Sequence, residues 1–246
     1  VTVVMLERSA PNKVEAARRL GAEVVFCVND FTVRTETVER LRREQGKVLV
    51  HSFDDEGTIC GNGTLGFELL EQLPDANAVL VPVSGGGLLA GVAAGLKQSG
   101  SRAQIYGVEP EVKPSLKVSL ERGEPTTIPN AVTIADGLVA TRPGKLTFAL
   151  AQKYVDGMLA VSEEEIAQAT VRLLEEAKLV VEPSGAVGVA ALLRYFAGPP
   201  KGDSPRASKE PSQKVVIVLS GGNVELGRLI ETVRQRAAAP VSSSLR

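Results

Sequence analysis

The chain has 246 residues, of which 43% are hydrophobic and 23% are charged, so it can bury the core of one large α/β domain or of two smaller ones. Its 28 basic and 29 acidic residues leave a net charge of −1, which gives no electrostatic support for binding to nucleic acid or to an anionic membrane. No apolar run approaches the roughly 20 residues of a membrane-spanning helix, and the first residues lack the layout of a signal peptide. Cys27 and Cys60 have no metal-type spacing and indicate a reducing compartment, so we expect a cytoplasmic protein.

The first part of the sequence alternates strand and helix patterns with short connections, which is typical of a parallel α/β architecture. The pattern predicts a strand over 1–6, a helix over 12–20, a strand over 23–28, a helix over 33–45 and an extended piece over 47–50. A glycine-containing turn over 57–63 is expected to precede a helix over 64–72. Because the chain starts inside a predicted strand without an initiator Met, we expect it to be part of a longer protein.

The second part continues the same alternation. It predicts a strand over 78–83, a helix that begins at 88, a strand over 104–108, an irregular segment over 125–141, helices over 146–155 and 162–179, a further helix after a break at 182–186, a solvated loop over 198–213 and a strand over 214–219. Ser162 and Glu165 have the spacing of a capping box, which favours a helix start there. The tail over 237–246 is expected to be disordered.

The most informative segment is the loop of Ser84, Gly85, Gly86 and Gly87, which joins an apolar strand to an Ala/Leu-rich helix. It places backbone N–H groups, unshielded by side chains, at a helix N-terminus. These donors and the positive end of the helix dipole converge on one point, which suits a phosphate group. Close packing in a tight turn would explain one glycine but not three, so the loop predicts a phosphorylated cofactor.

A dinucleotide is one alternative for this cofactor. Glu109 ends the next predicted strand, about twenty residues after the loop, where a ribose-binding acid lies in a Rossmann unit. However, Gly85, Gly87 and Gly91 have the spacing G-x-G-x-x-x-G, and only Ala90 fills the third position of the usual fingerprint. A nicotinamide-dependent dehydrogenase therefore stays open as an alternative.

A second small-residue loop, Ser220-Gly221-Gly222-Asn223, also follows an apolar strand. Ligands of open parallel sheets bind outside the carboxyl ends of the strands, so two such loops favour one shared ligand. A Rossmann enzyme does not require the second loop, which therefore favours another cofactor.

Other residues carry less chemical information. His51 is the only histidine, and no G-x-S-x-G segment accompanies it, so we expect a structural role at the joint between two elements. One histidine and two separated cysteines exclude a His/Cys zinc site, and Cys60 is expected to be a small buried residue. The segment over 182–185 is either a plain helix break or part of a site.

Several segments, taken in order, resemble the fold-type II pyridoxal-phosphate enzymes (the tryptophan synthase β-like fold), in particular the branch of serine racemase and the serine/threonine dehydratases. These segments are Ala10-Pro11-Asn12-Lys13, Leu20-Gly21-Ala22-Glu23-Val24, Phe53-Asp54-Asp55, Gly61-Asn62-Gly63-Thr64, Pro82 to Gly91, Thr133-Ile134-Ala135-Asp136-Gly137, Glu182-Pro183-Ser184-Gly185-Ala186 and Leu219-Ser220-Gly221-Gly222-Asn223. The resemblance implies an α/β fold with a parallel or mixed sheet flanked by helices. Residues 1–50 would be the remnant of a smaller α/β domain, 51–236 the large cofactor-binding domain without its N-terminal part, and 237–246 the tail.

The resemblance also assigns roles to single residues. The phosphate of pyridoxal 5′-phosphate would be held by Ser84, Gly85, Gly86, Gly87 and Leu88. Ser220 would face the pyridine nitrogen, where a neutral hydroxyl makes the ring a weaker electron sink. Gly137 and Glu182 would line the cofactor pocket.

Two further sites are implied by the same resemblance. A divalent cation, Mg²⁺ or Ca²⁺, would be bound by Glu109, by the carbonyl of Lys113 and by the side chain of Ser115, although an acidic residue is expected in place of this serine. Lys178 and Asn223 match positions that contact ATP in serine racemase.

The implied activity is that of a homodimeric dehydratase (ammonia-lyase) or racemase acting on serine or threonine. The α-proton of the amino acid is removed, and then either the β-hydroxyl group leaves or the proton returns on the other face. The family's Schiff-base lysine lies in a Ser-x-Lys-x-Arg-Gly segment and its substrate loop is Ser-Gly-Asn-His, and neither occurs in this chain. We therefore expect the chain alone to be inactive, and a catalytically incomplete fragment or pseudoenzyme is the second alternative.

Overall fold

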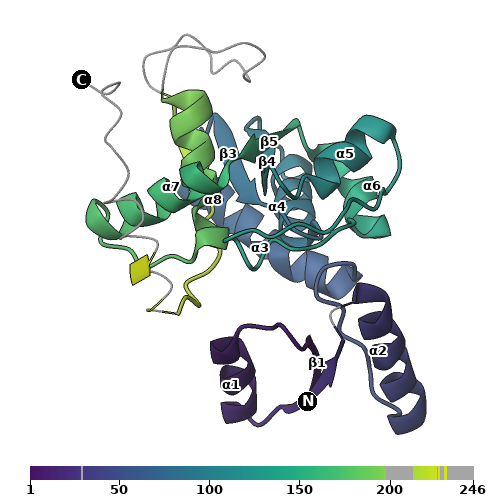
Figure 1. The fold of residues 1–246 in the computed structure, drawn as a ribbon. Coiled ribbons are helices and arrows are strands. Elements are labelled where there is room, and N and C mark those ends of the chain that lie inside the picture. The colour runs from purple at the N-terminus through teal and green to yellow at the C-terminus, as the bar shows by residue number, and fades with distance from the viewer. Residues whose placement is uncertain (29, 198–212, 226, 228–229, 232–246) are drawn as a thin grey trace. The chain divides into compact units, whose positions relative to one another are not determined.

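The computed structural model describes residues 1–28, 30–197, 213–225, 227 and 230–231. The chain divides into two compact units, Val1–Val50 and His51–Arg246, which Figure 1 shows as a ribbon. The predicted loop over 198–213 lies outside the described residues except for Gln213, and the predicted tail over 237–246 lies wholly outside them.

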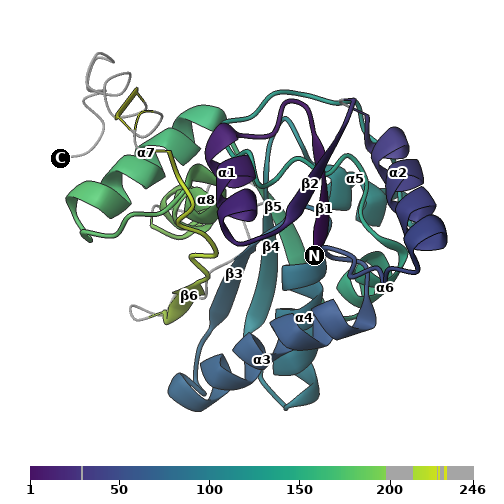
Figure 2. The same ribbon diagram turned by 90° about the horizontal axis from the view of Figure 1, so that it is seen from below.

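The first unit is a pair of parallel strands with two helices. Its elements are β1 (Thr2–Leu6), α1 (Pro11–Arg19), β2 (Glu23–Cys27) and α2 (Phe31–Gln45). The two strands pair in parallel along their whole length, and Figure 2 shows them side by side. Pro11 suits the first position of α1 because no intrahelical bond needs its missing N–H. The four elements predicted for this part are confirmed, with ends that differ by at most two residues.

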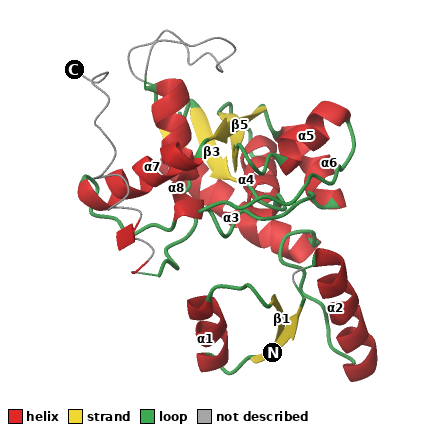
Figure 3. Ribbon diagram, viewed as in Figure 1, coloured by secondary structure: helices red, strands yellow, loops and turns green. Residues whose placement is uncertain are grey.

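The second unit contains a sheet of four parallel strands in the order β5-β4-β3-β6. The strands are β3 (Ala78–Pro82), β4 (Gln104–Pro110), β5 (Gly157–Val161) and β6 (Val215–Ile217). Figure 3 shows these strands in yellow among the helices of the unit. The predicted parallel α/β architecture is confirmed.

Helices cover both faces of this sheet. They are α3 (Glu56–Gln72), α4 (Gly87–Gln98), α5 (Ser115–Arg122), α6 (Lys145–Tyr154), α7 (Glu163–Glu175) and α8 (Pro183–Ala191), which continues as a π-helical turn over Leu192–Phe196. Leu80 of β3 belongs to an apolar cluster with residues of α7 and α8, whereas Val79 and Val81 belong to a second cluster with residues of α4 and α6. Because side chains alternate across a strand, β3 needs apolar residues at every position to serve both clusters.

The glycine-containing turn predicted over 57–63 is wrong, because α3 already begins at Glu56. Asp55 caps it by accepting a hydrogen bond from the Thr58 N–H at 3.0 Å. The glycines lie inside the helix, where a Cβ at Gly66 would be 2.9 Å from the carbonyl oxygen of Val92 in α4. They therefore serve the close approach of two helix backbones rather than a turn.

Three further differences concern short elements. α5 and β5 are present although the sequence pattern predicts neither, and α7 ends at Glu175 rather than near residue 179. The predicted capping box is confirmed, since the Ser162 side chain accepts from the Glu165 N–H and the Glu165 side chain accepts from the Ser162 N–H. The break predicted at 182–186 is the start of α8, with Glu182 as N-cap and Pro183 in the first turn.

The structure also decides the roles predicted for His51 and Cys60. The Nδ1 atom of His51 accepts hydrogen bonds from the backbone N–H groups of Phe53 at 3.3 Å and of Asp54 at 2.8 Å, which is the expected structural role at a joint. The prediction that Cys60 is buried is wrong, because it lies exposed on α3. Among the described residues, no helix combines the length and hydrophobicity needed to cross a membrane.

Candidate functional site

Two loops predicted to share a ligand lie at the same edge of the sheet. β3 and β6 are parallel neighbours, and the pairing extends past β6, where the Val218 N–H donates to the Leu80 carbonyl at 3.0 Å. The loop that starts at Ser84 and the loop that starts at Ser220 therefore follow the carboxyl ends of adjacent strands. This is the edge at which open parallel sheets bind ligands.

The loop after β3 presents unused backbone donors. Gly86 adopts φ = 95° as the N-cap of α4, a left-handed conformation that favours glycine. In the described part of the chain, no acceptor bonds the backbone N–H groups of the five residues from Gly85 to Leu89. Of these five, only Leu88 is not buried. Such a row of N–H groups at a helix N-terminus binds an anion well.

Neighbouring segments hold this loop in place. The ring of Phe53 lies so close to Gly85 that any Cβ there would overlap it. On the other side, a Cβ at Gly86 would be 3.0 Å from the Cβ of Thr147. The Ser84 hydroxyl oxygen accepts a hydrogen bond from the Ala140 N–H at 3.1 Å, so this predicted phosphate residue also anchors the irregular segment over 125–141.

Gly137 and Glu182, predicted to line the same pocket, lie together. The Gly137 N–H donates to the Ser184 hydroxyl oxygen at 2.8 Å, and a Cβ at Gly137 would be 3.5 Å from Oε1 of Glu182. The Glu182 N–H donates to the Gly221 carbonyl at 3.0 Å, and a Cβ at Gly221 would overlap the Glu182 carboxylate. The structure thus joins the segment before α8 to the loop after β6, in which Ser220 is exposed.

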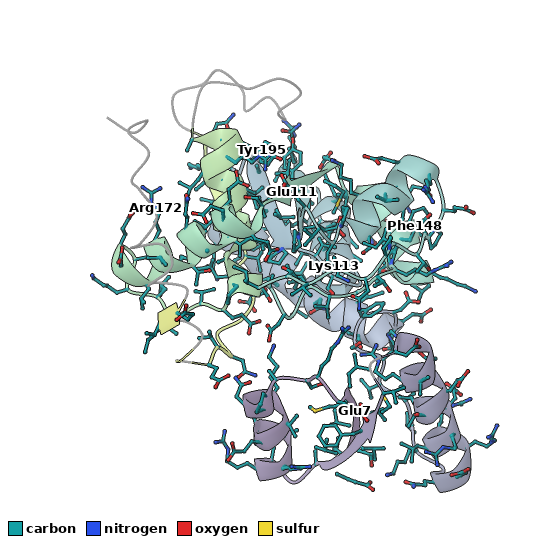
Figure 4. The ribbon with its side chains drawn as sticks, viewed as in Figure 1. Glu7, Glu111, Lys113, Phe148, Arg172 and Tyr195 are labelled. Atoms are coloured by element: carbon teal, nitrogen blue, oxygen red, sulfur yellow. The ribbon has the colours of Figure 1, made fainter. Side chains whose placement is uncertain are left out.

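The predicted cation ligands occupy a different place. Glu109 is 0% exposed and accepts hydrogen bonds from the N–H groups of Leu116 at 2.8 Å and of Lys117 at 3.0 Å, so it caps α5. The Ser115 hydroxyl donates to Glu109 at 3.4 Å. Lys113, labelled in Figure 4, is 2% exposed and its Nζ donates to Oδ1 of Asn130 at 2.5 Å. Among the described residues, no three His, Cys, Asp or Glu side chains are grouped to hold a metal, and the cation site stays a prediction.

Burial also changes the acid strength of Glu109. Loss of hydration raises the pKa of this carboxyl to about 7, although the N–H groups of Leu116 and Lys117 oppose the shift. A buried carboxylate that caps a helix has no surface to offer a ribose. The structure therefore speaks against the dinucleotide alternative.

The predicted effector residues lie at the surface. Lys178 follows α7 with φ = 59°, and its Nζ donates to the Glu175 carbonyl at 2.6 Å. Asn223 is exposed in the loop after β6. A Cβ at Gly222 would be 3.2 Å from the Val180 carbonyl oxygen, so the two surface segments are close to each other. Their binding of a nucleotide stays a prediction.

Comparison with known proteins decides the family. The model of the family described as pyridoxal-phosphate dependent enzyme matches residues 1–221. The chain belongs to this family. The resemblance found in the sequence is confirmed, and the glycine loop belongs to a pyridoxal-phosphate site rather than to a dinucleotide site.

Curated relatives within the family carry out ammonia-lyase or racemase reactions by name. An L-threonine ammonia-lyase of Thermotoga maritima is 42% identical over 228 residues, which cover 93% of this chain and 54% of that protein. A serine racemase of Oryza sativa subsp. indica is 36% identical over 236 residues, which cover 95% of this chain and 67% of that protein. The chain thus spans about half the length of the curated ammonia-lyases that it matches.

Solved structures confirm the fold class. A bacterial threonine deaminase, from the organism abbreviated T.th., has a TM-score of 0.81 and 40% identity, over 91% of this chain and 70% of that chain. Maize serine racemase has a TM-score of 0.84 and 34% identity, over 96% of this chain and 70% of that chain. The fold is therefore that of the fold-type II enzymes.

The residues present fit the family's cofactor. Its phosphate carries negative charge, and the buried N–H groups from Gly85 to Leu89 have no acceptor among the described residues. Sequence reasoning missed Thr147, which supports this loop, and it quoted Phe53 and Asp54 only as part of a family segment. The conspicuous signal is the Phe53-Asp54-Asp55 sequence itself, but nothing in it reveals a contact with the glycine loop.

Proposed function

We propose that this chain is the cofactor-binding part of a pyridoxal-phosphate dependent enzyme that removes ammonia from serine or threonine, or racemises serine. The observation that carries the proposal is the row of unused N–H groups after β3, next to a loop after β6 in the same family fold. The names of the Thermotoga maritima and Oryza sativa relatives support the substrate class.

The cofactor supplies an electron-withdrawing ring that weakens the Cα–H bond of a bound amino acid. The N–H groups from Gly85 to Leu89 would bind its phosphate, and the Ser220 hydroxyl would lie against the pyridine nitrogen. Gly137 and Glu182 would form one wall of the pocket, where the absence of a side chain on Gly137 leaves room. These residue roles are part of the proposal.

Other features of the proposal are finer. We include a homodimeric complete enzyme, a small first domain that corresponds to Val1–Val50, and a cytoplasmic location, which the free thiols of Cys27 and Cys60 support. A cation held at Glu109, Lys113 and Ser115 and a nucleotide at Lys178 and Asn223 also remain proposals, supported only by the family resemblance.

Equilibrium titration with pyridoxal 5′-phosphate, with pyridoxal as the control without phosphate, tests the cofactor site. We expect the chain to bind the phosphorylated compound at least about tenfold more tightly, because only the phosphate engages the N–H groups of the loop. Gly86→Ala should remove this preference, because φ = 95° strains any residue with a Cβ. Equal affinity for the two compounds would overturn the assignment of the site.

Turnover is tested separately from binding. The chain with pyridoxal phosphate and L-threonine should release no 2-oxo acid, because it contains no Ser-x-Lys-x-Arg-Gly segment. A chimera in which the part of the Thermotoga maritima protein before the matched region precedes Val1 should release 2-oxobutanoate. If the chimera folds and binds the cofactor but acts on neither threonine nor serine, the proposed substrate class is wrong.

A further inference from the structure

The carbonyl oxygen of Gly85 is held by the first turn of α6. The Thr147 hydroxyl donates to this oxygen at 2.7 Å, and the Gly144 N–H donates to it at 3.3 Å. The same hydroxyl is 3.3 Å from the Gly144 carbonyl, so its shorter contact is with Gly85. Thr147 is 0% exposed, and bulk water therefore does not compete for its hydroxyl.

This contact also fixes the direction of the next N–H group. The described chain has no cis peptide bond, so the Gly85–Gly86 unit is planar and trans, with its C=O and N–H on opposite sides. A bond that turns the Gly85 carbonyl toward α6 turns the Gly86 N–H away from α6. That N–H is one of the buried donors that no described acceptor uses.

The start of α6 is itself anchored from a distant segment. The carboxylate of Asp54 accepts hydrogen bonds from the N–H groups of Lys145 at 3.0 Å, Leu146 at 2.9 Å and Thr147 at 3.2 Å. It thus caps α6 across about ninety residues of sequence, where Gly144 leaves no side chain in its way.

The side chain of Thr147 also limits where the loop can lie. A Cβ at Gly86 would be 3.0 Å from Cβ and 3.1 Å from Oγ1 of Thr147, which is closer than ordinary packing allows. The ring of Phe53 packs against Gly85 from a second direction. Two neighbours and one hydrogen bond therefore restrict the loop to one backbone conformation.

We propose that Thr147 is a positioning residue for the cofactor phosphate: its hydroxyl, held in place by the Asp54 cap of α6, orients the Gly85–Gly86 peptide so that the Gly86 N–H points at the phosphate. The inference rests on the proposed function, because it concerns the same phosphate site. Thr147 does not touch the cofactor in this role but acts through the backbone of the loop.

The test compares Thr147→Val, which keeps the shape of the side chain and removes the hydroxyl, with Thr147→Ser, which restores the hydroxyl. In the full chain, Thr147→Val should raise the dissociation constant of pyridoxal 5′-phosphate about fivefold, the effect of one lost hydrogen bond, and change that of pyridoxal by less than about twofold. Thr147→Ser should recover most of the loss.

Thr170→Val is the matched control. Thr170 is 1% exposed and its hydroxyl donates to the Ile166 carbonyl at 2.8 Å inside α7, so its replacement removes a comparable buried hydroxyl elsewhere. It should leave both dissociation constants unchanged. A readout without cofactor completes the test, because the amide NMR resonance of Gly86 should move in Thr147→Val and stay in place in Thr170→Val.

The outcomes separate this inference from the proposed function. If the wild-type chain shows no preference for the phosphorylated compound, the proposed function fails and this inference fails with it. If the wild-type chain shows the preference and Thr147→Val keeps it with an unmoved Gly86 resonance, only the positioning role is wrong. A loss that Thr147→Ser does not recover would likewise overturn the role of the hydroxyl.

Discussion

The packing of α3 against α4 allows a sharp prediction about a buried glycine, because the two helices approach at their backbones. A Cβ added at Gly91 would lie 2.5 Å from the Ile59 carbonyl oxygen, 2.7 Å from the Asn62 Cβ and 2.8 Å from the Gly63 nitrogen. Two of these atoms belong to the backbone of α3, which cannot rotate away as a flexible side chain could. Gly91→Ala must therefore push the helices apart.

The size of the effect follows from two opposing terms. Overpacking of this kind costs about 1–3 kcal/mol or more, whereas alanine in place of glycine inside a helix gains about 0.5–1 kcal/mol. We expect Gly91→Ala to lower the free energy of unfolding by about 1–2 kcal/mol. Gly61 on α3 is the matched control, because it is exposed and a Cβ there meets nothing within 4 Å. Gly61→Ala should gain the alanine term alone.

Urea unfolding followed by far-ultraviolet circular dichroism measures the difference. With a dependence of about 1–3 kcal/mol per molar urea, the midpoint of Gly91→Ala should lie roughly 1 M below that of Gly61→Ala. Equal midpoints, or a higher one for Gly91→Ala, would show that the glycines of the interface do not serve close helix packing.

Two more predictions concern buried carboxylates that cap distant helices. Because burial raises the pKa of Glu109 from 4.5 to about 7, the native state binds an extra proton between these values, and stability should fall as the pH rises through this window. Unfolding midpoints between pH 5 and 8 check this: the wild type should lose stability relative to Glu109→Gln, and parallel curves would contradict it. Asp54→Ala should cost about 1–2 kcal/mol of stability and also weaken pyridoxal phosphate binding, because it frees the start of α6. Ser162→Ala, which removes the cap of α7, should lower stability alone, and equal effects of the two variants on cofactor affinity would refute the link.

Local patterns in the sequence predicted the parts of the site that are contiguous in the chain. An apolar strand, a glycine loop and an Ala/Leu-rich helix follow one another over 78–98, so each signal reinforces the next. The capping box at Ser162 is equally local, since both partners lie within one helical turn. These elements are confirmed because their hydrogen bonds and burial depend on neighbouring residues.

The missed elements depend on distant partners. α5 is only eight residues long and its N–H groups are capped by Glu109 from another element, so its own sequence carries a weak helix signal. β5 is five residues long and is stabilised by pairing with β4. Such short segments are decided by tertiary contacts rather than by propensity.

The sequence by itself determined the family, the parallel α/β class and the loop that presents donors to a phosphate. Only the tertiary structure showed that the glycines of α3 allow two helices to touch, and that Thr147 and Asp54 support the phosphate loop across separations of 62 and 93 residues. The physical reason is that a glycine specifies only the absence of a side chain. Whether that space admits a turn, a ligand or another backbone depends on what the fold brings next to it.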